Sequence, residues 1–291
     1  MRPSARATCR GSAVGPGKSA DLPSPNKLSA GAETPPPRRE SDMLLKDKVC
    51  VITGAASARG IGKATARLFA AQGGRVVILD LDAGQAEAAA REIGPGHFGL
   101  ACDVANRTAC QAAADEVIAQ AGRIDVLVNN AGISQPLKLM EIEAANYDAV
   151  TDVNLRGTLY MSQAVVPAMR RQRTGAIVCM SSVSAQRGGG IFGSPHYSAA
   201  KAGVLGLAKA MARELGSDGI RVNSVTPGLI QTDITAGKLT DAMRAEIVSG
   251  IPLGRLGVAD DVANVCLFLA SDLSAYLTGA VIDVNGGMLI H

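Results

Sequence analysis

Tyr197 and Lys201 are the residues whose types and spacing most directly suggest chemistry. They lie four positions apart in the segment His196-Tyr197-Ser198-Ala199-Ala200-Lys201, so on a helix both project from the same face. A free tyrosine has a pKa of about 10, and a nearby cation favours the phenolate and lowers that pKa. The pair therefore suggests a general acid/base for an alcohol or a carbonyl. The same spacing occurs on many solvated helices, so the pair alone does not establish this chemistry. Oxidation or reduction of the substrate also requires a hydride carrier.

A glycine-rich turn supplies a place for such a carrier. The apolar run Val49–Thr53 is followed by Gly54, and Gly60 and Ile61 open a helical pattern that continues to Ala71. A turn of this kind lets backbone N–H groups approach a pyrophosphate, and the helix N-terminus favours its negative charge. The pattern predicts a dinucleotide site.

Asp80 stands eighteen residues beyond Gly62, at the end of the second predicted strand. A carboxylate there hydrogen-bonds the free 2′-hydroxyl of an adenosine ribose and repels a 2′-phosphate. Arg59 opposes this preference, because a cation in the loop pairs with a 2′-phosphate. We give Asp80 the greater weight and predict NAD as the cofactor rather than NADP.

The elements that must position these residues alternate along the chain. Helical patterns at Ile61–Ala71, Ala105–Ala121 and Ser198–Leu215 lie between short β-rich runs. This alternation predicts an α/β fold, a single Rossmann-like doubly wound domain with a mostly parallel seven-stranded sheet flanked by helices. The candidate strands are Val49–Thr53, Arg75–Asp80, Phe98–Cys102, Val126–Asn129, Ala176–Met180, Arg221–Thr226 and Ala280–Val284.

Composition separates residues 1–42 from the rest of the 291-residue chain. They hold seven of the thirteen prolines, seven basic and four acidic side chains, so they account for the whole net charge of +3. Such a segment buries too little apolar surface to offset its chain entropy, and we expect a disordered Pro/Arg-rich tail. Its early basic residues also resemble an organellar transit peptide, and Met43 is an alternative start. We expect one catalytic domain over residues 43–291.

Several partner classes lack a sequence signal. No apolar run approaches the ~18–20 residues that cross a bilayer, and the neutral body carries no basic patch for nucleic acid. The three histidines are far apart and the six cysteines form no CxxC pair, so we expect no metal site and cysteines that are reduced and buried. We expect a soluble, cytoplasmic protein that acts on a small molecule.

A set of motifs in a fixed order resembles the short-chain dehydrogenase/reductase family across residues 43–291. The motifs are Thr53-Gly54 with Gly60-Ile61-Gly62, Asn129-Asn130-Ala131-Gly132, Asn154, Tyr197 with Lys201, and Pro227-Gly228. The resemblance implies hydride transfer between a nicotinamide cofactor and a secondary alcohol or ketone, with the cofactor carrying the hydride.

The resemblance also implies individual roles. Tyr197 would be the acid/base, Lys201 would lower its pKa and bind the nicotinamide ribose, and Asn154 would anchor a water in a proton relay from Lys201. A serine after the fifth strand in sequence would hydrogen-bond the reacting oxygen. Residues expected at the cofactor are Gly54, Ser57, Arg59, Gly60, Ile61, Asp80, Asp103, Val104, Asn130, Ala131, Gly132, Tyr197, Lys201, Pro227, Gly228, Ile230 and Thr232.

The sequence departs from the family pattern twice. Five residues separate Gly54 from Gly60 where the motif has three, so we expect a bulge near the phosphates that leaves the helix N-terminus in place. The family's serine lies thirteen residues before the tyrosine, which falls on Ser184, whereas the strand end points to Ser182. We favour Ser182, because strand geometry sets side-chain direction more firmly than loop length does.

The sequence leaves the substrate class open. A polyol, a sugar or a hydroxy acid is favoured by four polar side chains, those of Gln135, Gln186, Arg187 and His196. The stretch Ile251-Pro252-Leu253-Gly254-Arg255 also resembles 3-oxoacyl-thioester reductases, against which Asp80 argues because such reductases generally use NADPH. The intact catalytic set argues against a third reading, a non-catalytic nucleotide-binding scaffold.

Two further expectations concern surfaces. The stretch Thr232–Gly250 is spaced like an amphipathic helix, through Ile234, Leu239, Met243 and Ile247, and either packs on the core or contacts substrate. Small residues along Ala202–Ala208 suit close helix packing, and the family usually forms dimers or tetramers. We expect a homotetramer.

Overall fold

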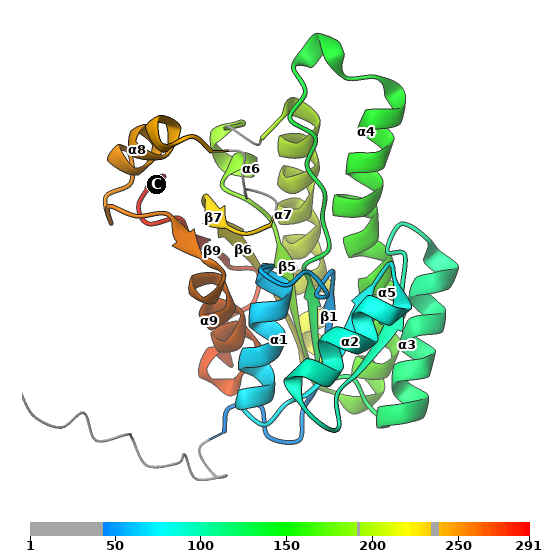
Figure 1. Ribbon diagram of the computed structural model, residues 1–291. Coiled ribbons are helices and arrows are strands. Elements are labelled where there is room, and N and C mark those ends of the chain that lie inside the picture. Colours follow the sequence, from blue (N-terminus) through cyan, green and yellow to red (C-terminus); the bar gives the residue numbers. More distant parts are fainter. Residues whose placement is uncertain (1–42, 191–192, 234–238) are drawn as a thin grey trace, which may run out of the picture. The chain divides into compact units, whose positions relative to one another are not determined.

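A parallel sheet forms the centre of the computed structural model, which describes residues 43–190, 193–233 and 239–291 (Figure 1). In this part of the chain a seven-stranded sheet has the strand order β3-β2-β1-β4-β5-β6-β9, and every pairing in it is parallel. The predicted α/β doubly wound fold is confirmed. The predicted tail, residues 1–42, lies outside the described residues, so the domain boundary at residue 43 stays a prediction.

The strands of this sheet begin and end within one residue of the predicted bounds. β-branched and apolar residues fill them because both faces of the sheet are covered. The strands are β1 (Val49–Thr53), β2 (Arg75–Asp80), β3 (Phe98–Ala101), β4 (Val126–Asn129), β5 (Gly175–Met180), β6 (Ile220–Pro227) and β9 (Val281–Val284). A separate parallel pair joins β7 (Ile230–Gln231) to β8 (Gly257–Val258).

Helices cover both faces of the sheet. On one face lie α3 (Arg107–Ala121), α5 (Gly157–Gln172) and α7 (Pro195–Leu215). On the other lie α1 (Ile61–Ala71), α2 (Ala83–Ile93) and α9 (Ala259–Ala270). Figure 1 shows α1 and α9 side by side on this second face. Shorter helices are α4 (Ala144–Thr151), α6 (Ser184–Arg187) and α8 (Asp241–Ser249).

Alternation along the strands divides the core between the two faces. Val51 and Val77 pack with the α3, α5 and α7 side, whereas their neighbours Ile52 and Ile78 pack with the α1, α2 and α9 side. All four side chains are buried. Successive residues of a strand point to opposite faces, so a continuous apolar run serves two core layers at once.

Capping residues explain where two helices differ from prediction. The side chain of Asn106 accepts a hydrogen bond from the Ala109 N–H, so α3 begins at Arg107 and not at Ala105. Pro195 occupies the first position of α7, where its missing N–H costs nothing, so this helix begins three residues before the predicted Ser198. Tyr197 therefore lies in the first turn of α7.

The strand order places a crevice at the centre of one sheet edge. β1 is bonded to β2 on one side and to β4 on the other, and the chain crosses to opposite halves of the sheet from these two strands. In open α/β sheets ligands bind outside the carboxyl ends of the strands at such a switch point. Gly54 and Asn130, which follow β1 and β4, both lie there.

Across the described ranges, none of the helices combines the length and the apolar character that crossing a membrane would need.

Gly99 on β3 provides a test of the packing between β3 and α2. A Cβ at this position would lie 2.1 Å from the Ala86 carbonyl carbon and 2.3 Å from its oxygen, so the backbones would have to separate. We expect Gly99→Ala to lower the free energy of unfolding by about 1–3 kcal/mol, measured by urea denaturation. Gly216→Ala is the matched control, because nothing lies within 4 Å and its φ is −57°. An equal loss in both variants would contradict this packing.

Candidate functional site

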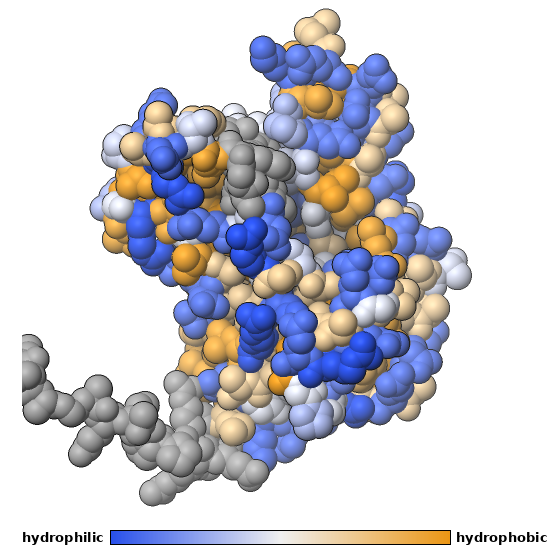
Figure 2. Space-filling view, in the orientation of Figure 1, coloured by the Kyte–Doolittle hydropathy of each residue, from blue (hydrophilic) through white to orange (hydrophobic). Residues whose placement is uncertain are grey.

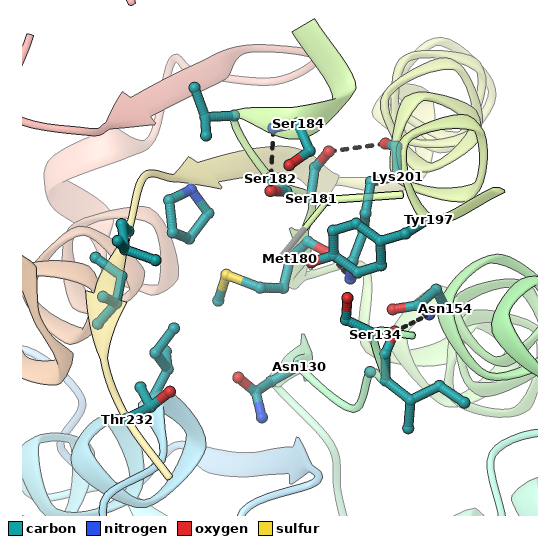
Figure 3. A pocket seen from close by; sticks show the side chains of 18 of the residues that line it. Asn130, Ser134, Asn154, Met180, Ser181, Ser182, Ser184, Tyr197, Lys201 and Thr232 are labelled. Carbon is teal, nitrogen blue, oxygen red and sulfur yellow. Dashed lines mark hydrogen bonds between the residues drawn. The ribbon is translucent and has the colours of Figure 1, made fainter. Parts of the chain in front are cut away.

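A cavity of about 950 Å³ opens at the carboxyl ends of the strands (Figure 3). Every predicted catalytic or cofactor-binding residue lines it except Arg59. In the close view Tyr197, Lys201 and Asn154 lie together on one side, and Asn130 and Thr232 lie toward the other end. The tertiary structure thus brings together residues that are spread from position 54 to position 232 of the sequence.

The glycine loop begins with a close backbone contact. Gly54 has φ +64°, and a Cβ there would lie 2.7 Å from the Ala131 Cα, so only glycine fits this turn. Gly60 is the N-cap of α1 and donates its N–H to the Ser57 carbonyl. The helix N-terminus stays at Ile61 despite the two extra loop residues, as expected.

Hydrogen bonds join the ends of β1 and β4. Thr53 Oγ1 accepts from the backbone N–H groups of Asn130 and Ala131, each at 3.0 Å. Asn130 Nδ2 donates in return to the carbonyls of Thr53 and Gly54, each at 2.9 Å. The glycine loop and the Asn-Asn-Ala-Gly turn are therefore held as one unit beside the cavity.

Asp80 and Asp103 line the far end of the cavity. Asp80 accepts from the backbone N–H groups of Ala56 and Leu81, each at 2.9 Å, so its carboxylate is pinned against the glycine loop. Asp103 accepts from the Ala105 N–H at 2.9 Å. A carboxylate oxygen accepts more than one hydrogen bond, so both side chains keep capacity for a ligand hydroxyl or amine.

Arg59 does not line the cavity, in contrast to the prediction. Its guanidinium pairs instead with Asp233, which follows β7, and Ser57 donates to the same carboxylate. The sequence analysis missed Asp233, although it directly follows the predicted Thr232. No local pattern marks it, because its partners lie 174 and 176 positions earlier in the chain.

Burial dominates the electrostatics of Tyr197 and Lys201. Lys201 Nζ donates to the Met180 carbonyl at 2.7 Å and lies 5.9 Å from the Tyr197 ring centroid. Burial lowers the pKa of Lys201 to about 8. Burial also raises the pKa of Tyr197, against a smaller lowering by a hydrogen bond with Ser182. The lowering of the Tyr197 pKa by Lys201 stays a prediction, and in this structure the Lys201 ammonium donates to the Met180 carbonyl.

The two candidate serines occupy different positions. Ser182 forms a hydrogen bond with Tyr197, and its Oγ also accepts from the Ser184 N–H at 3.1 Å. Ser184 is the first residue of α6, and its hydroxyl lies where a Cβ on Gly193 would meet it at 2.5 Å. Ser182 is therefore the serine in contact with the tyrosine.

Asn154 lies in a π-helical turn, Asp152–Arg156, between α4 and α5. Its Nδ2 donates to the carbonyls of Val150 and Ile133, each at 2.8 Å, while its buried Oδ1 has no hydrogen-bond partner among the described residues. Such π-bulges are frequent at functional sites because they turn a side chain out of the regular helix. A Cβ on Gly132 would lie 2.6 Å from that Oδ1 and 3.3 Å from Lys201 Nζ, so both groups face the same point.

Apolar side chains form part of the rest of the cavity lining. Met243 and Ile247 project from α8 into the cavity, so the amphipathic helix expected there contacts the cavity instead of the core. Figure 2 shows hydrophilic and hydrophobic residues mixed over α8, as an amphipathic helix presents them. The expected positions Ile234 and Lys238 lie outside the described residues. Other apolar lining residues that the sequence analysis missed are Ile133, Met180, Val183, Leu229 and Met288.

Of the polar residues first assigned to the substrate, only Arg187 lines the cavity. Gln186 donates instead to Asp283 Oδ1 at 2.9 Å, and His196 is buried with neither ring nitrogen bonded. Gln135 also lies outside the lining. Within the described ranges, no three His, Cys, Asp or Glu side chains are grouped as metal ligands.

The cavity fits a dinucleotide. It runs from Asp80 and Asp103 past the glycine loop to Tyr197, and it exposes the loop at the N-terminus of α1. Asn154 Oδ1 is a buried acceptor that lacks a protein donor, as expected of a group that binds a water or a ligand. When bound, a nicotinamide cofactor supplies or accepts a hydride.

Known proteins resemble this chain over most of its length. Residues 54–289 match the family model described as enoyl-(acyl carrier protein) reductase. An uncharacterized short-chain type dehydrogenase/reductase, y4mP, from Sinorhizobium fredii is 65% identical over 86% of this chain and 100% of its own length. The 3-oxoacyl-[acyl-carrier-protein] reductases FabG of Thermotoga maritima and Escherichia coli are 45% and 40% identical, over 85% and 84% of this chain and 100% and 99% of theirs. This chain belongs to the short-chain dehydrogenase/reductase family and is an oxidoreductase that uses a nicotinamide cofactor and acts on CH–OH groups.

Proposed function

We propose that this enzyme reduces a 3-oxoacyl thioester to the 3-hydroxyacyl thioester, reversibly, with NADH. The observation that carries the proposal is the apolar surface of α8, where Met243 and Ile247 line the same cavity as Tyr197. An acyl chain buries its methylene groups against such a surface. The likeness to reductases named for 3-oxoacyl carrier-protein substrates supports the same class, carried by acyl carrier protein or coenzyme A.

Tyr197 and Ser182 act on the reacting oxygen in this proposal. In reduction the Tyr197 hydroxyl gives its proton to the carbonyl oxygen while the carbonyl carbon gains the hydride, and in oxidation the phenolate takes that proton back. The raised pKa of Tyr197 keeps it protonated, as an acid must be. The Ser182 hydroxyl donates to the oxygen as negative charge develops.

Lys201 and Asn154 supply the proton route. The Lys201 ammonium, oriented by the Met180 carbonyl, would bind the nicotinamide ribose and would favour the phenolate as it forms. The buried Asn154 Oδ1 would accept a hydrogen bond from a water. This water would take part in the proton relay that runs from Lys201. Gly132 leaves the space in which these groups meet.

The proposed preference for NAD rests on Asp80. Its carboxylate lines the cavity beside the glycine loop, where it accepts a hydrogen bond from a ribose 2′-hydroxyl and repels a 2′-phosphate. Asp103 and Val104 would contact the adenine, and Pro227, Gly228, Ile230 and Thr232 the nicotinamide. NADP is the less favoured cofactor in this proposal.

A polyol substrate is less well supported. Of the four polar residues that favoured a polyol in the sequence, only Arg187 lines the cavity. We also propose that the enzyme forms a homotetramer and is located in the cytoplasm. The five cysteines in the described part are free and buried, as suits a reducing compartment.

Substrate assays test the proposed function. We expect kcat/KM for acetoacetyl-CoA with NADH to exceed that for sorbitol with NAD by roughly 100-fold, because the proposed enzyme is specific for 3-oxoacyl thioesters. Turnover of sorbitol without turnover of the thioester would overturn the proposal.

A variant on α8 tests the apolar lining separately. We expect Ile247→Asn to raise KM for a longer 3-oxoacyl-CoA about tenfold, because it removes methylene contacts. Ala245→Asn is the control, since Ala245 is exposed on the same helix and does not line the cavity. Equal KM values for the two variants would show that α8 does not bind the acyl chain.

The two serines are separated by single substitutions. We expect Ser182→Ala to lower kcat about 100-fold, because one donor to the developing oxyanion is lost. Ser184→Ala should stay near the unmodified enzyme. The opposite pattern in steady-state kinetics would assign the role to Ser184.

The pH dependence tests Lys201. Its ammonium form is present below its pKa of about 8 and is lost as the pH rises through that value, whereas Tyr197 keeps its proton to higher pH. We therefore expect kcat/KM for reduction to fall above about pH 8. A profile that stays flat to pH 10 would show that this proton is not needed.

A further inference from the structure

The carboxylate of Asp233 is held by three donors of the glycine loop. Ser57 Oγ donates to Oδ2 at 2.8 Å, the Arg59 backbone N–H donates to Oδ2 at 3.1 Å, and Arg59 Nε donates to Oδ1 at 2.6 Å. Asp233 follows β7, so the segment that carries Pro227 and Thr232 reaches across to the loop that precedes α1.

These hydrogen bonds keep Asp233 ionised. The Arg59 guanidinium, followed by the Ser57 hydroxyl, lowers the pKa of Asp233 to about 2. The pair is partly exposed, with 68% of the Arg59 side chain and 39% of the Asp233 side chain accessible. Salt therefore weakens this contact, and a charged ligand can compete for either partner.

The same loop is held by a second carboxylate. Asp80 accepts from the Ala56 N–H, on the strand side of the loop, and Asp233 accepts from Ser57 and Arg59. The Arg59 guanidinium and the carboxylates of Asp80 and Asp233 thus lie around the same short loop. A 2′-phosphate brought to this loop meets a negative field, and the cation that would pair with it is already paired.

We propose that Asp233 is a specificity-determining residue of the cofactor site, which acts by withholding the Arg59 guanidinium from a 2′-phosphate. This rests on the proposed preference for NAD and adds a cause for it. Asp80 disfavours the phosphate directly, whereas Asp233 removes the loop cation that would compensate. Asp233 is a positioning residue here, because it acts through Arg59 and not on the reacting atoms.

Asp233→Asn tests the proposal, since it keeps the size and one acceptor of the side chain but removes its charge. Dissociation constants for NADH and NADPH are measured on the full chain by the fluorescence of the reduced nicotinamide. We expect Kd for NADPH to fall about fivefold while Kd for NADH changes less than about twofold. Asp115→Asn is the charge-matched control, because Asp115 is exposed on α3 and accepts a hydrogen bond from Gln111 Nε2 at 2.9 Å.

A double-mutant cycle shows whether the effect passes through Arg59. In an Arg59→Ala background the gain in NADPH binding from Asp233→Asn should disappear. A gain that persists without Arg59, or that is equal for NADH and NADPH, would overturn the proposal. Asp233→Ser, with thermal unfolding of each variant, separates a binding effect from a folding defect.

The cycle is independent of which cofactor the unmodified enzyme prefers. If that enzyme binds NADPH more tightly than NADH, the proposed NAD preference is wrong, while a change in the Kd ratio that requires Arg59 still supports the link from Asp233 to Arg59. If the ratio does not change in any variant, the role of Asp233 is wrong while the preference of the unmodified enzyme stands on its own measurement.

Discussion

The hydrogen-bonded junction between the ends of β1 and β4 is the interaction on which the site depends. Thr53 and Asn130 exchange donors and acceptors across the point where the sheet order reverses. Because these bonds join two backbone turns, they set the glycine loop on one side and the Asn-Asn-Ala-Gly turn on the other. Asn154 depends on this second turn, since its side chain donates to the Ile133 carbonyl.

Burial of charge shapes the chemistry on the Tyr197 side of the cavity. Lys201 is almost fully buried, and its ammonium is held by a carbonyl and by no carboxylate among the described contacts. Desolvation therefore disfavours its charge and brings its pKa close to neutrality. The same burial raises the pKa of Tyr197. Burial thus keeps the Tyr197 phenol protonated and makes the Lys201 ammonium easier to deprotonate.

The opposite end of the cavity is governed by carboxylates at the surface. Asp80 and Asp233 approach the glycine loop from strands that are distant in sequence, and both bond to groups of that loop. The charge balance around Arg59 is therefore a property of two loops together. The proposed substrate contact likewise depends on segments distant in sequence, because α8 and the turn after β4 line the same cavity as Tyr197.

Local patterns were sufficient for the sheet and for most of the site. Apolar runs of strand length predicted each strand of the main sheet, because a strand buried on both faces must be apolar throughout. Ordered motifs predicted the residues that line the cavity, since turns after parallel strands meet at one edge. Helix starts were less accurate at α3 and α7, where Asn106 and Pro195 decided the first turn.

Side-chain direction and long-range pairing required the tertiary structure. The count along the loop gave Ser184 and the strand end gave Ser182, which we favoured, and the fold brings Ser182 to Tyr197. From the sequence, the Arg59 guanidinium was free to pair with a phosphate, whereas in the structure it pairs with Asp233. The sequence by itself determined the fold class and the reaction chemistry, because these follow from periodicity and from residue types in order. The tertiary structure decided which charged side chains are paired and which parts of the cavity lining are apolar, because those contacts join residues far apart in the chain.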